Sequence, residues 1–537
     1  VVVTKPSLKE EAYFGDSYSL ELNAAYTQTF AEKHTIDAKA VFTVSENNGS
    51  YFWASRKDYL SATVDQLFAG SSIGMQNSGN SDEGGRMGLV GRLKYDFDSR
   101  YYIEGSFRYD GSDNFAPGHR WGFFPSVALA WDITEEPFFK NLNLKNVNLL
   151  KLRGSYGQTG TESGVNRFGY LSTYSLAENA ICIGGNLQSG FNEGALVSPE
   201  LLSWYTRNSL NYGIDVAFFN HRLKGSADYF FYVTKGGLVS PADRYVVPLG
   251  TALPQIKSEN EHRREGFEAS LRWDDKIGSG FYYEVGTNMT YYNNLYVKNQ
   301  GEALSDLKNP YKRSTHQTDY YGIMYMDNGL YQTPEQVLGV PRRLQSSATK
   351  LGDIAYEDIN GDGKIDGEDQ IRWGMPSAPH FTYGFDFVLG YKGFTLSGLL
   401  YGTGKRNMEF GVTTKKNEAI WVLNDYQLDY WREDNRDATF PRISLEALPN
   451  GSNNQAASTF WVKNASFLRL KNLTLEYDFK YKLLRNVKWL STCRANITGA
   501  NLFTISNVMD YFDPETTSTN GGYPVQRVYS LGVTIGF

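Results

Sequence analysis

The sequence lacks the features that define several classes of protein. It has only two cysteines, Cys182 and Cys493, far apart in the chain, which excludes a disulfide framework and a metal-thiolate motif. No run of about 18 consecutive apolar residues occurs, so we expect no membrane-spanning helix. The opening VVVTKPSLKEEAYFG has none of the three sections of a signal peptide. Strands that cross a membrane are compatible with all of these absences.

A strong charge of one sign and a catalytic motif are also missing. The chain has 53 Lys and Arg against 59 Asp and Glu, a formal charge of −6, and no basic block, so we expect no nucleic-acid partner. The six histidines show no HExxH spacing, and no segment resembles GxSxG or a P-loop. We therefore expect that the protein is not an enzyme.

The chain is rich in aromatic residues and in alternating segments. Aromatic residues make up 15% of it while the mean hydropathy is −0.45, which favours strands with one apolar and one polar face. YYIEGSFRYD at 101–110, NLTLEYDF at 472–479 and YSLGVTIGF at 529–537 alternate in this way. Further segments are 36–44, 87–97, 210–218, 223–233, 267–273, 283–291, 381–391 and 394–400, with weaker ones at 20–26, 127–133, 150–156 and 493–499. We predict about 15 strands.

The connections between these segments alternate between short and long. The short ones are 30–33, 98–100, 220–221, 275–279 and 392–393, and the long ones are 45–84, 158–207, 234–264, 293–378, 402–464 and 501–526. Outer-membrane barrels have short periplasmic turns and long outside loops. The pattern predicts an all-β fold, a transmembrane antiparallel β-barrel in contact with outer-membrane lipid. A soluble all-β adhesin or lectin is the alternative.

One predicted outside loop contains an acidic motif, YEDINGDGKIDGEDQIRW at 356–373. Its candidate ligands stand at positions 1, 3, 5, 7, 9 and 12 of an EF-hand-like frame: Asp358, Asn360, Asp362, Lys364, Asp366 and Asp369. Lys364 would offer its backbone carbonyl. A weak Ca²⁺ site that stiffens the loop is one interpretation, and a polar turn without an ion is the other.

Aromatic residues in two settings are candidates for different roles. Trp121, Phe123, Phe124 and Trp131 suggest an aromatic girdle at a membrane interface. Aromatic residues in the predicted loops lie away from the membrane interface and are therefore candidates for substrate binding. They are Trp204, Tyr205, Tyr320, Tyr321, Tyr325, Trp421, Tyr426, Tyr430 and Trp431.

Four longer segments carry further information: RYDGSDNFAPGHRWGFFPSVALAWDITEEPFF at 108–139, KLGDIAYEDINGDGKIDGEDQIRWGMPSAPHFTYGFDFVLGYKGFTLSGLLYG at 350–402, SFLRLKNLTLEYDF at 466–479 and RVYSLGVTIGF at 527–537. Together they resemble the barrel of SusC/RagA-like TonB-linked outer-membrane proteins. The resemblance implies a 22-strand barrel with a plug, a SusD-like surface lipoprotein over its mouth and TonB-driven uptake of oligosaccharides or peptides. It also implies the outer membrane of a Bacteroidota-type bacterium. The terminal Phe537 is similar to the signal read by the barrel assembly machinery.

The resemblance also predicts how the chain divides into domains. We expect residues 1–537 to be the C-terminal part of one barrel domain, because about 15 strands would leave an open edge in hydrocarbon. Plug and early strands, and with them the contact to TonB, would belong to a missing N-terminal region. Two functions follow as hypotheses: an importer of large nutrients, or a structural scaffold of a larger outer-membrane assembly.

Overall fold

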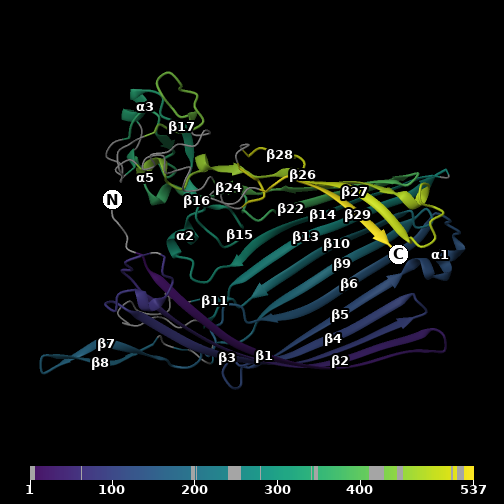
Figure 1. Ribbon diagram of the computed structural model, residues 1–537, viewed down its shortest axis with the longest axis horizontal. Helices are drawn as coiled ribbons and strands as arrows, with labels where there is room; N and C mark the ends of the chain where they lie inside the picture. Colours follow the sequence, from purple (N-terminus) through teal and green to yellow (C-terminus); the bar gives the residue numbers. More distant parts are fainter. Residues whose placement is uncertain are drawn as a thin grey trace. The chain divides into compact units, whose positions relative to one another are not determined.

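The computed structural model describes most of the chain. The described residues are 6–61, 63–194, 197, 200, 202–239, 256–278, 280–339, 342–343, 349–409, 428–443, 451–508, 512–516 and 525–537. Within these ranges, none of the helices has the length and apolar character needed to cross a membrane. The chain forms two compact units, and we describe each by itself (Figure 1).

The first unit contains the long strands at the N-terminal end. These are β1 (Leu8–Phe30), β2 (His34–Arg56), β3 (Gln76–Phe97), β4 (Tyr101–Ser112) and β5 (Trp121–Asp132). Each pairs antiparallel with the next, and no register shift interrupts the 23 residue pairs that join β1 to β2. An uninterrupted register keeps every side chain on its own face of the sheet.

The second unit contains the strands of the C-terminal end. These are β13 (Glu261–Ile277), β14 (Phe281–Lys298), β22 (Phe381–Tyr391), β23 (Phe394–Gly404), β26 (Phe467–Asp478), β27 (Thr492–Ala500) and β29 (Val528–Gly536). They too pair antiparallel, from β13 with β14 to β27 with β29. β6 (Val147–Thr161), β9 (Tyr205–Phe218) and β10 (Leu223–Lys235) have residues in both units.

The predicted number of strands is confirmed. One sheet includes 17 of the described strands, and two of them, β15 (Gln317–Thr318) and β28 (Thr504–Ser506), have only two or three residues. The other 15 are the strands named above, against about 15 predicted. The all-β fold with a large antiparallel sheet is therefore confirmed.

Alternation gives the strands one apolar and one polar face. On β29, Tyr529, Leu531 and Val533 expose 72%, 76% and 64% of their side chains although they are apolar. On β4 and β5, Ile103 and Leu129 lie directly opposite each other and are both exposed. Such a face suits the hydrocarbon of a bilayer, which satisfies no backbone hydrogen bond, so the cross-strand pairing must satisfy them all.

The short turns are tight because their residues adopt positive φ angles. Lys392 and Gly393 join β22 to β23 with φ angles of 46° and 88°. Asp98 and Ser99, at 56° and 54°, do the same between β3 and β4. Two residues with positive φ give the primed turns whose twist matches that of the flanking strands. The predicted short connections are thus confirmed, and we call this end of the sheet the short-turn end.

The predicted long loops are shorter than expected because several strands extend into them. Residues 45–56 and 76–84 were predicted as loop but belong to β2 and β3. The prediction was wrong there because ENNGS and NSGNSDEGG lack an apolar alternation. Their backbones are nevertheless paired, residue by residue, so a strand above the membrane needs no lipid-facing side chains.

The long-loop end also contains short elements of its own. They are η1 (Leu67–Ala69), β7 (Tyr174–Ile183), β8 (Asn186–Glu193), β11 (Leu238–Val239), β12 (Ile256–Lys257), α2 (Leu304–Lys308), β16 (Gly322–Tyr325), β17 (Asp327–Leu330), α3 (Pro334–Gly339), β18 (Arg342–Arg343), β19 (Ile354–Tyr356), β20 (Lys364–Ile365), η6 (Gly367–Asp369), β21 (Gln370–Trp373), β24 (Asn407–Glu409), α5 (Gly451–Asn454), η8 (Thr459–Trp461) and β25 (Val462–Asn464). Three others, η2 (Ile133–Glu135), α1 (Pro137–Asn141) and η9 (Phe479–Tyr481), lie at the short-turn end.

The two faces of β5 predict opposite responses to one charge. Leu129→Arg places a cation in lipid and should destabilise the barrel by about 2–4 kcal/mol if it lies near the midplane. Ala128→Arg, on the polar face opposite Glu104, should change stability little. Urea unfolding in lipid vesicles, followed by heat-modifiable migration, measures both. Equal losses of stability in the two variants would contradict the assigned faces.

Candidate functional site

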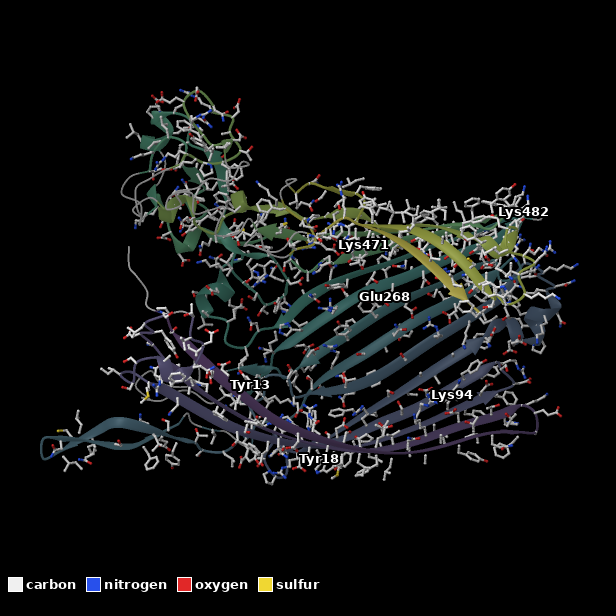
Figure 2. The ribbon with its side chains drawn as sticks, in the orientation of Figure 1. Tyr13, Tyr18, Lys94, Glu268, Lys471 and Lys482 are labelled. Carbon is white, nitrogen blue, oxygen red and sulfur yellow. The ribbon has the colours of Figure 1, made fainter. Side chains whose placement is uncertain are left out.

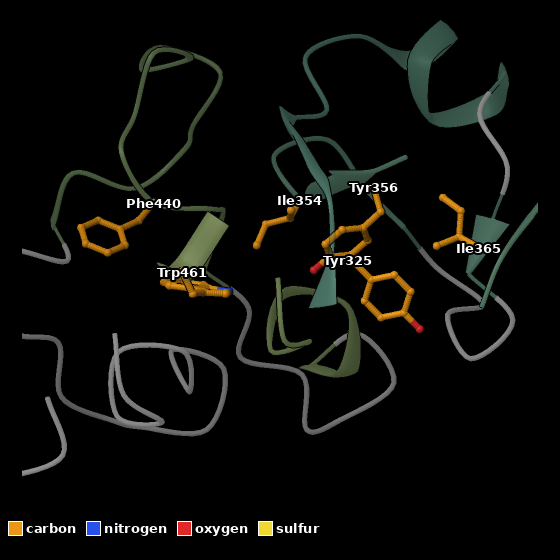
Figure 3. Packing of buried hydrophobic residues seen from close by; sticks show 6 residues of the cluster. All are labelled: Tyr325, Ile354, Tyr356, Ile365, Phe440 and Trp461. Carbon is orange, nitrogen blue, oxygen red and sulfur yellow. The ribbon is translucent and has the colours of Figure 1, made fainter. Parts of the chain in front are cut away.

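The long loops of the second unit build a small domain with its own core, which we call the loop head (the described residues 322–339, 342–343, 349–373, 428–443 and 451–461). Six side chains form this core: Tyr325, Ile354, Tyr356, Ile365, Phe440 and Trp461, all at most 6% exposed (Figure 3). They come from β16, β19, β20, η8 and the stretch 428–443. Their burial fixes the shape of the loop head independently of any lipid contact.

A buried polar network holds this core together. The Asp353 carboxylate, which is fully buried, forms an ion pair with Arg442, whose Nε lies 2.7 Å from Oδ1, and accepts a hydrogen bond from Asn454 Nδ2 at 3.0 Å. Trp461 Nε1 donates to the Asn454 carbonyl at 2.7 Å. A buried charge is tolerated only when it is paired and hydrogen-bonded, so this network constrains how residues 350–356 meet Arg442 and residues 451–461.

The acidic motif lies beside this core and is organised by Asp369. This carboxylate is fully buried and accepts three backbone N–H groups, from Ile359 at 2.9 Å, Asn360 at 3.3 Å and Asp366 at 2.8 Å. Asp366 in turn accepts from Glu368 N and completes a capping box with Asp369. Asp369 therefore closes the loop onto its own backbone.

Two further aspartates of the motif also accept backbone N–H groups. Asp358 accepts from Gly361 and Gly363, and Asp362 accepts from Lys364. Asn360 accepts from Asp362 N, and Gly361 and Gly363 have positive φ angles. Across the part of the chain that the structure describes, no group of three or more His, Cys, Asp or Glu residues is placed to hold a metal ion. Binding of Ca²⁺ by this loop stays a prediction.

The aromatic candidates in the loop head are used for packing. Tyr325 belongs to the core, and Tyr430 packs against it. Trp431 is 7% exposed, lies against Gly352 and donates from Nε1 to Gln332 Oε1 at 3.0 Å. Trp421 and Tyr426 lie outside the described residues.

The remaining aromatic candidates also have structural partners. Trp204 donates to the Arg120 carbonyl at 2.9 Å and packs against Phe115 and Phe124. Tyr205 donates to the Ser163 carbonyl at 2.6 Å, and the Arg372 guanidinium lies 3.7 Å from the Tyr320 ring centroid. Burial raises the pKa of Tyr321. Substrate binding by these side chains stays a prediction.

One member of the predicted aromatic girdle faces the other way. Trp121 and Phe123 are exposed, as a girdle requires, whereas Phe124 is only 6% exposed. Its ring fills the space over Gly122 and Gly160, where an added Cβ would come within 2.3 Å of it. The prediction was wrong for Phe124 because two successive residues of a strand point to opposite faces.

The polar face of the second unit is lined with paired charges. Arg153 of β6 reaches both oxygens of Asp215 on β9, at 2.8 and 2.9 Å, and both oxygens of Asp228 on β10, at 3.0 Å each. Arg272 of β13 bridges Glu284 of β14 and Asp386 of β22 in the same manner. An arginine between two carboxylates leaves a net negative group, which is stable only where water or polar groups reach it.

The chain ends on an exposed aromatic residue. Phe537 is 84% exposed, and its ring stacks at 5.8 Å on Trp489 with an interplanar angle of 13°. It continues the apolar face of Tyr529, Leu531 and Val533 on β29. Recognition by the assembly machinery stays a prediction, although the pattern that it requires is present.

The sequence analysis missed a group of exposed and half-buried aromatic residues where β1 and β2 extend beyond their apolar segments. Tyr13 and Tyr51 lie opposite each other and stack at 4.6 Å. Their segment was read as lying outside any strand, so their alternation was not considered. Alternating aromatic residues in EEAYFGDSY and in SYFW are the signal that could have revealed the two neighbouring faces.

The fold and its two faces define an outer-membrane β-barrel protein. The family model "TonB dependent receptor-like, beta-barrel" matches residues 6–502, so the chain belongs to this family. It is 27% identical over 465 residues to the TonB-dependent receptor SusC of Bacteroides thetaiotaomicron, covering 83% of this chain and 43% of that protein. The TonB-dependent receptor P3 of Formosa agariphila is 26% identical over 521 residues, 92% of this chain and 49% of that protein.

Solved structures of the SusC/RagA type share the fold. The RagAB peptide importer in its "open-open" state gives a TM-score of 0.80 with 21% identity, covering 98% of this chain and 55% of that one. Its "closed-closed" state gives 0.76 with 22% identity, at 98% and 56% coverage. The expected resemblance and the outer-membrane location are confirmed. The chain spans about half the length of the curated relatives that it matches.

The three backbone contacts of Asp369 make it the most sensitive position of the acidic motif. Asp369→Asn leaves no acceptor for the Asp366 N–H group and should cost about 1–3 kcal/mol of local stability. Glu368→Gln removes one ion pair between the exposed Glu368 side chain and the largely buried Lys312, and should cost less than Asp369→Asn. Hydrogen exchange of residues 356–373 reports both changes. Unaltered exchange in Asp369→Asn would show that this carboxylate does not organise the loop.

Proposed function

We propose that this chain forms the barrel wall of a TonB-dependent importer of large polar nutrients, oligosaccharides or peptides, in the outer membrane. The observation that supports it most is the polar face of the barrel strands. Groups such as Arg153 with Asp215 and Asp228 need water or polar cargo beside them. A wall that is apolar on one side and charged on the other suits a polar conduit through lipid.

The relatives support the coupling to TonB and a role in import. SusC and P3 are named as TonB-dependent receptors, and RagAB is described as a peptide importer with open and closed states. By analogy, the energy for uptake would come from TonB through a region outside this chain. We propose no chemical step, because transport requires only binding and a change of conformation.

We propose that a SusD-like surface lipoprotein is the partner that closes the mouth of the barrel. The hairpin of β7 and β8 offers it a contact, because Leu176 and Phe191 lie opposite each other and are 80% and 73% exposed. An isolated two-stranded hairpin is marginally stable in water, and exposed apolar side chains are typical of interaction sites. A protein partner that covers Leu176 and Phe191 would stabilise the hairpin.

A deletion strain distinguishes import from the scaffold hypothesis. If the protein is an importer, a strain that lacks its gene should lose growth on at least one polysaccharide or protein digest supplied as sole carbon source. Expression of the gene from a plasmid should restore that growth. Normal growth of the deletion strain on the whole panel, together with loss of other outer-membrane proteins from the membrane, would favour the scaffold and overturn import.

The hairpin contact predicts a specific loss of the partner. Leu176→Asp combined with Phe191→Asp should abolish co-purification of the lipoprotein with the detergent-extracted barrel, because two buried carboxylates would be left unpaired. Asn186→Asp at the tip of the hairpin, already polar and exposed, serves as the control. Retention of the lipoprotein by the double variant would place the interface elsewhere.

A further inference from the structure

The first three strands are much longer than a membrane requires. β1 has 23 residues, whereas a tilted strand crosses hydrocarbon with about 9–11 residues. The apolar alternation of β1 begins at Leu20, and Glu10 and Asp16 break it in the preceding part. About 12 residues of β1 therefore extend beyond the hydrocarbon, a length of roughly 40 Å at about 3.4 Å per residue. The paired parts of β2 and β3 accompany them.

An aromatic cluster lies on one face of this extension. Tyr13 of β1 is paired with Tyr51 of β2, and their rings stack with centroids 4.6 Å apart and an interplanar angle of 26°. Trp53 is two residues beyond Tyr51 on the same face, with Lys9 Nζ 4.6 Å from its ring centroid. Tyr13 is 71% exposed while Tyr51 and Trp53 are half-buried, so the Tyr13 ring offers the face that it does not stack on Tyr51. We call Tyr13, Tyr51 and Trp53 the aromatic platform.

The platform faces the same side as the polar wall of the barrel. The register between β1 and β2 has no shift, so all odd-numbered residues of the two strands share one face. On that face Thr27 donates to Asp37 at 3.2 Å, and Asp37 forms an ion pair with Arg92 of β3. Even-numbered residues such as Leu20 and Tyr18 are on the other face (Figure 2 labels Tyr13 and Tyr18). Cargo moving along the polar wall would meet the platform.

The ring orientations are fixed by hydrogen bonds before any ligand arrives. Tyr51 donates to Glu11 Oε1 at 2.9 Å and accepts from Lys9 Nζ at 3.3 Å, while Tyr13 donates to Glu11 Oε2 at 3.3 Å. Glu11 also forms an ion pair with Lys9, and these hydrogen bonds hold the pKa of Glu11 below its ordinary value. Because the two tyrosine side chains are already ordered, the free energy of ligand binding includes little of the entropy cost of ordering them.

The surroundings of the platform are flat, polar and balanced in charge. Gly15 and Gly49 are paired with each other next to the tyrosines on the same face, so no side chain stands there. Asn80 and Ser78 of β3 are opposite Tyr51 and Trp53 and offer amide and hydroxyl groups. The nearby charges come in pairs, Lys9 with Glu11 and Asp82 with Arg167.

These features select one kind of ligand. The face of an aromatic ring is electron-rich and attracts polarised C–H groups, which the flat faces of pyranose rings present. Hydroxyl and amide groups at the rim satisfy the sugar hydroxyls. An anionic ligand finds no unpaired cation among these described residues, and a cationic side chain finds the Trp53 ring already beneath Lys9.

We infer that the aromatic platform is a binding site for neutral oligosaccharides, which holds one or two sugar rings against Tyr13 and Tyr51 ahead of the conduit. The inference rests on the proposed import function and narrows its cargo to glycans. The peptide alternative then becomes an outcome of the test. The aromatic platform would be a binding site that cargo meets before it enters the barrel. The inference involves no residue of the loop head.

The test compares two pairs of stacked rings on opposite faces of the same strands. Tyr13→Ala with Tyr51→Ala removes the platform, and Phe14→Ala with Phe52→Ala removes the neighbouring pair, whose rings are 6.1 Å apart on the other face. The protein is extracted with its natural partners. Calorimetry then measures its binding to gluco-, manno- and xylo-hexasaccharides and to tryptic casein peptides. Heat-modifiable migration verifies that each variant is folded.

The unmodified protein should bind at least one of the hexasaccharides. The tyrosine variant should bind it about tenfold more weakly or worse, and the phenylalanine variant should bind it unchanged. Tyr13→Phe, which keeps the ring, should retain most of the affinity. The inference is overturned if no hexasaccharide binds, if only peptides bind, or if both double variants bind the sugar equally.

Growth separates failure of the inference from failure of the proposed function. A deletion strain that loses growth on a polymer, while the tyrosine variant restores growth and binds normally, refutes the platform and leaves import standing. A deletion strain that grows normally on every polymer refutes import whatever the platform binds. Impaired growth of the tyrosine variant on the corresponding glycan, with the phenylalanine variant unaffected, supports both.

Discussion

The backbone hydrogen bonds between neighbouring strands are the constraint on which the rest of this structure depends. In hydrocarbon no water replaces a missing partner, so each N–H and C=O group must be paired with the next strand. The uninterrupted registers of β1 with β2 and of β22 with β23 show this pairing over their whole lengths. Once the backbone is paired in this way, the register fixes the face of every position. The sequence can then vary only in which side chain, apolar or polar, stands at each position.

The choice of side chain at each position explains how one chain forms both the barrel strands and the separate loop head. Within the membrane, alternation places Leu129 and Leu531 on the lipid side and ion pairs such as Arg272 with Asp386 on the other. Beyond the membrane the alternation is released, and the long loops need a core of their own around Trp461 and Ile354. The buried Asp353 must be paired with Arg442 and Asn454, and this requirement limits the arrangements that the core can adopt.

The sequence predicted the features that follow from local periodicity. The number of strands, their faces and the tight turn at Lys392 and Gly393 could all be read from alternation and turn chemistry. The extent of β2 and β3 could not, because ENNGS carries no apolar pattern and is held as strand by its paired neighbours. Tertiary pairing overrides weak local preference at such places.

The site was less predictable than the fold, for a related reason. Aromatic residues in a loop were taken as ligand candidates, yet Tyr325 and Trp431 became buried because the long loop folds into a domain. Tyr13 and Tyr51 meet only across two strands, so their stacking depends on a register that single segments do not reveal. The acidic motif was found correctly as a loop, but the three backbone contacts of Asp369 needed the folded geometry.

The most direct measurement of the central claim is a scan of lipid contact along β4. Single cysteines at successive positions from 101 to 110, in a background without Cys182 and Cys493, would carry a fluorophore in vesicles of brominated lipid. We expect strong quenching at every second position, including 103 and 107, and weak quenching between them. Uniform quenching, or maxima every three to four residues, would contradict a wall of paired strands with one face in lipid.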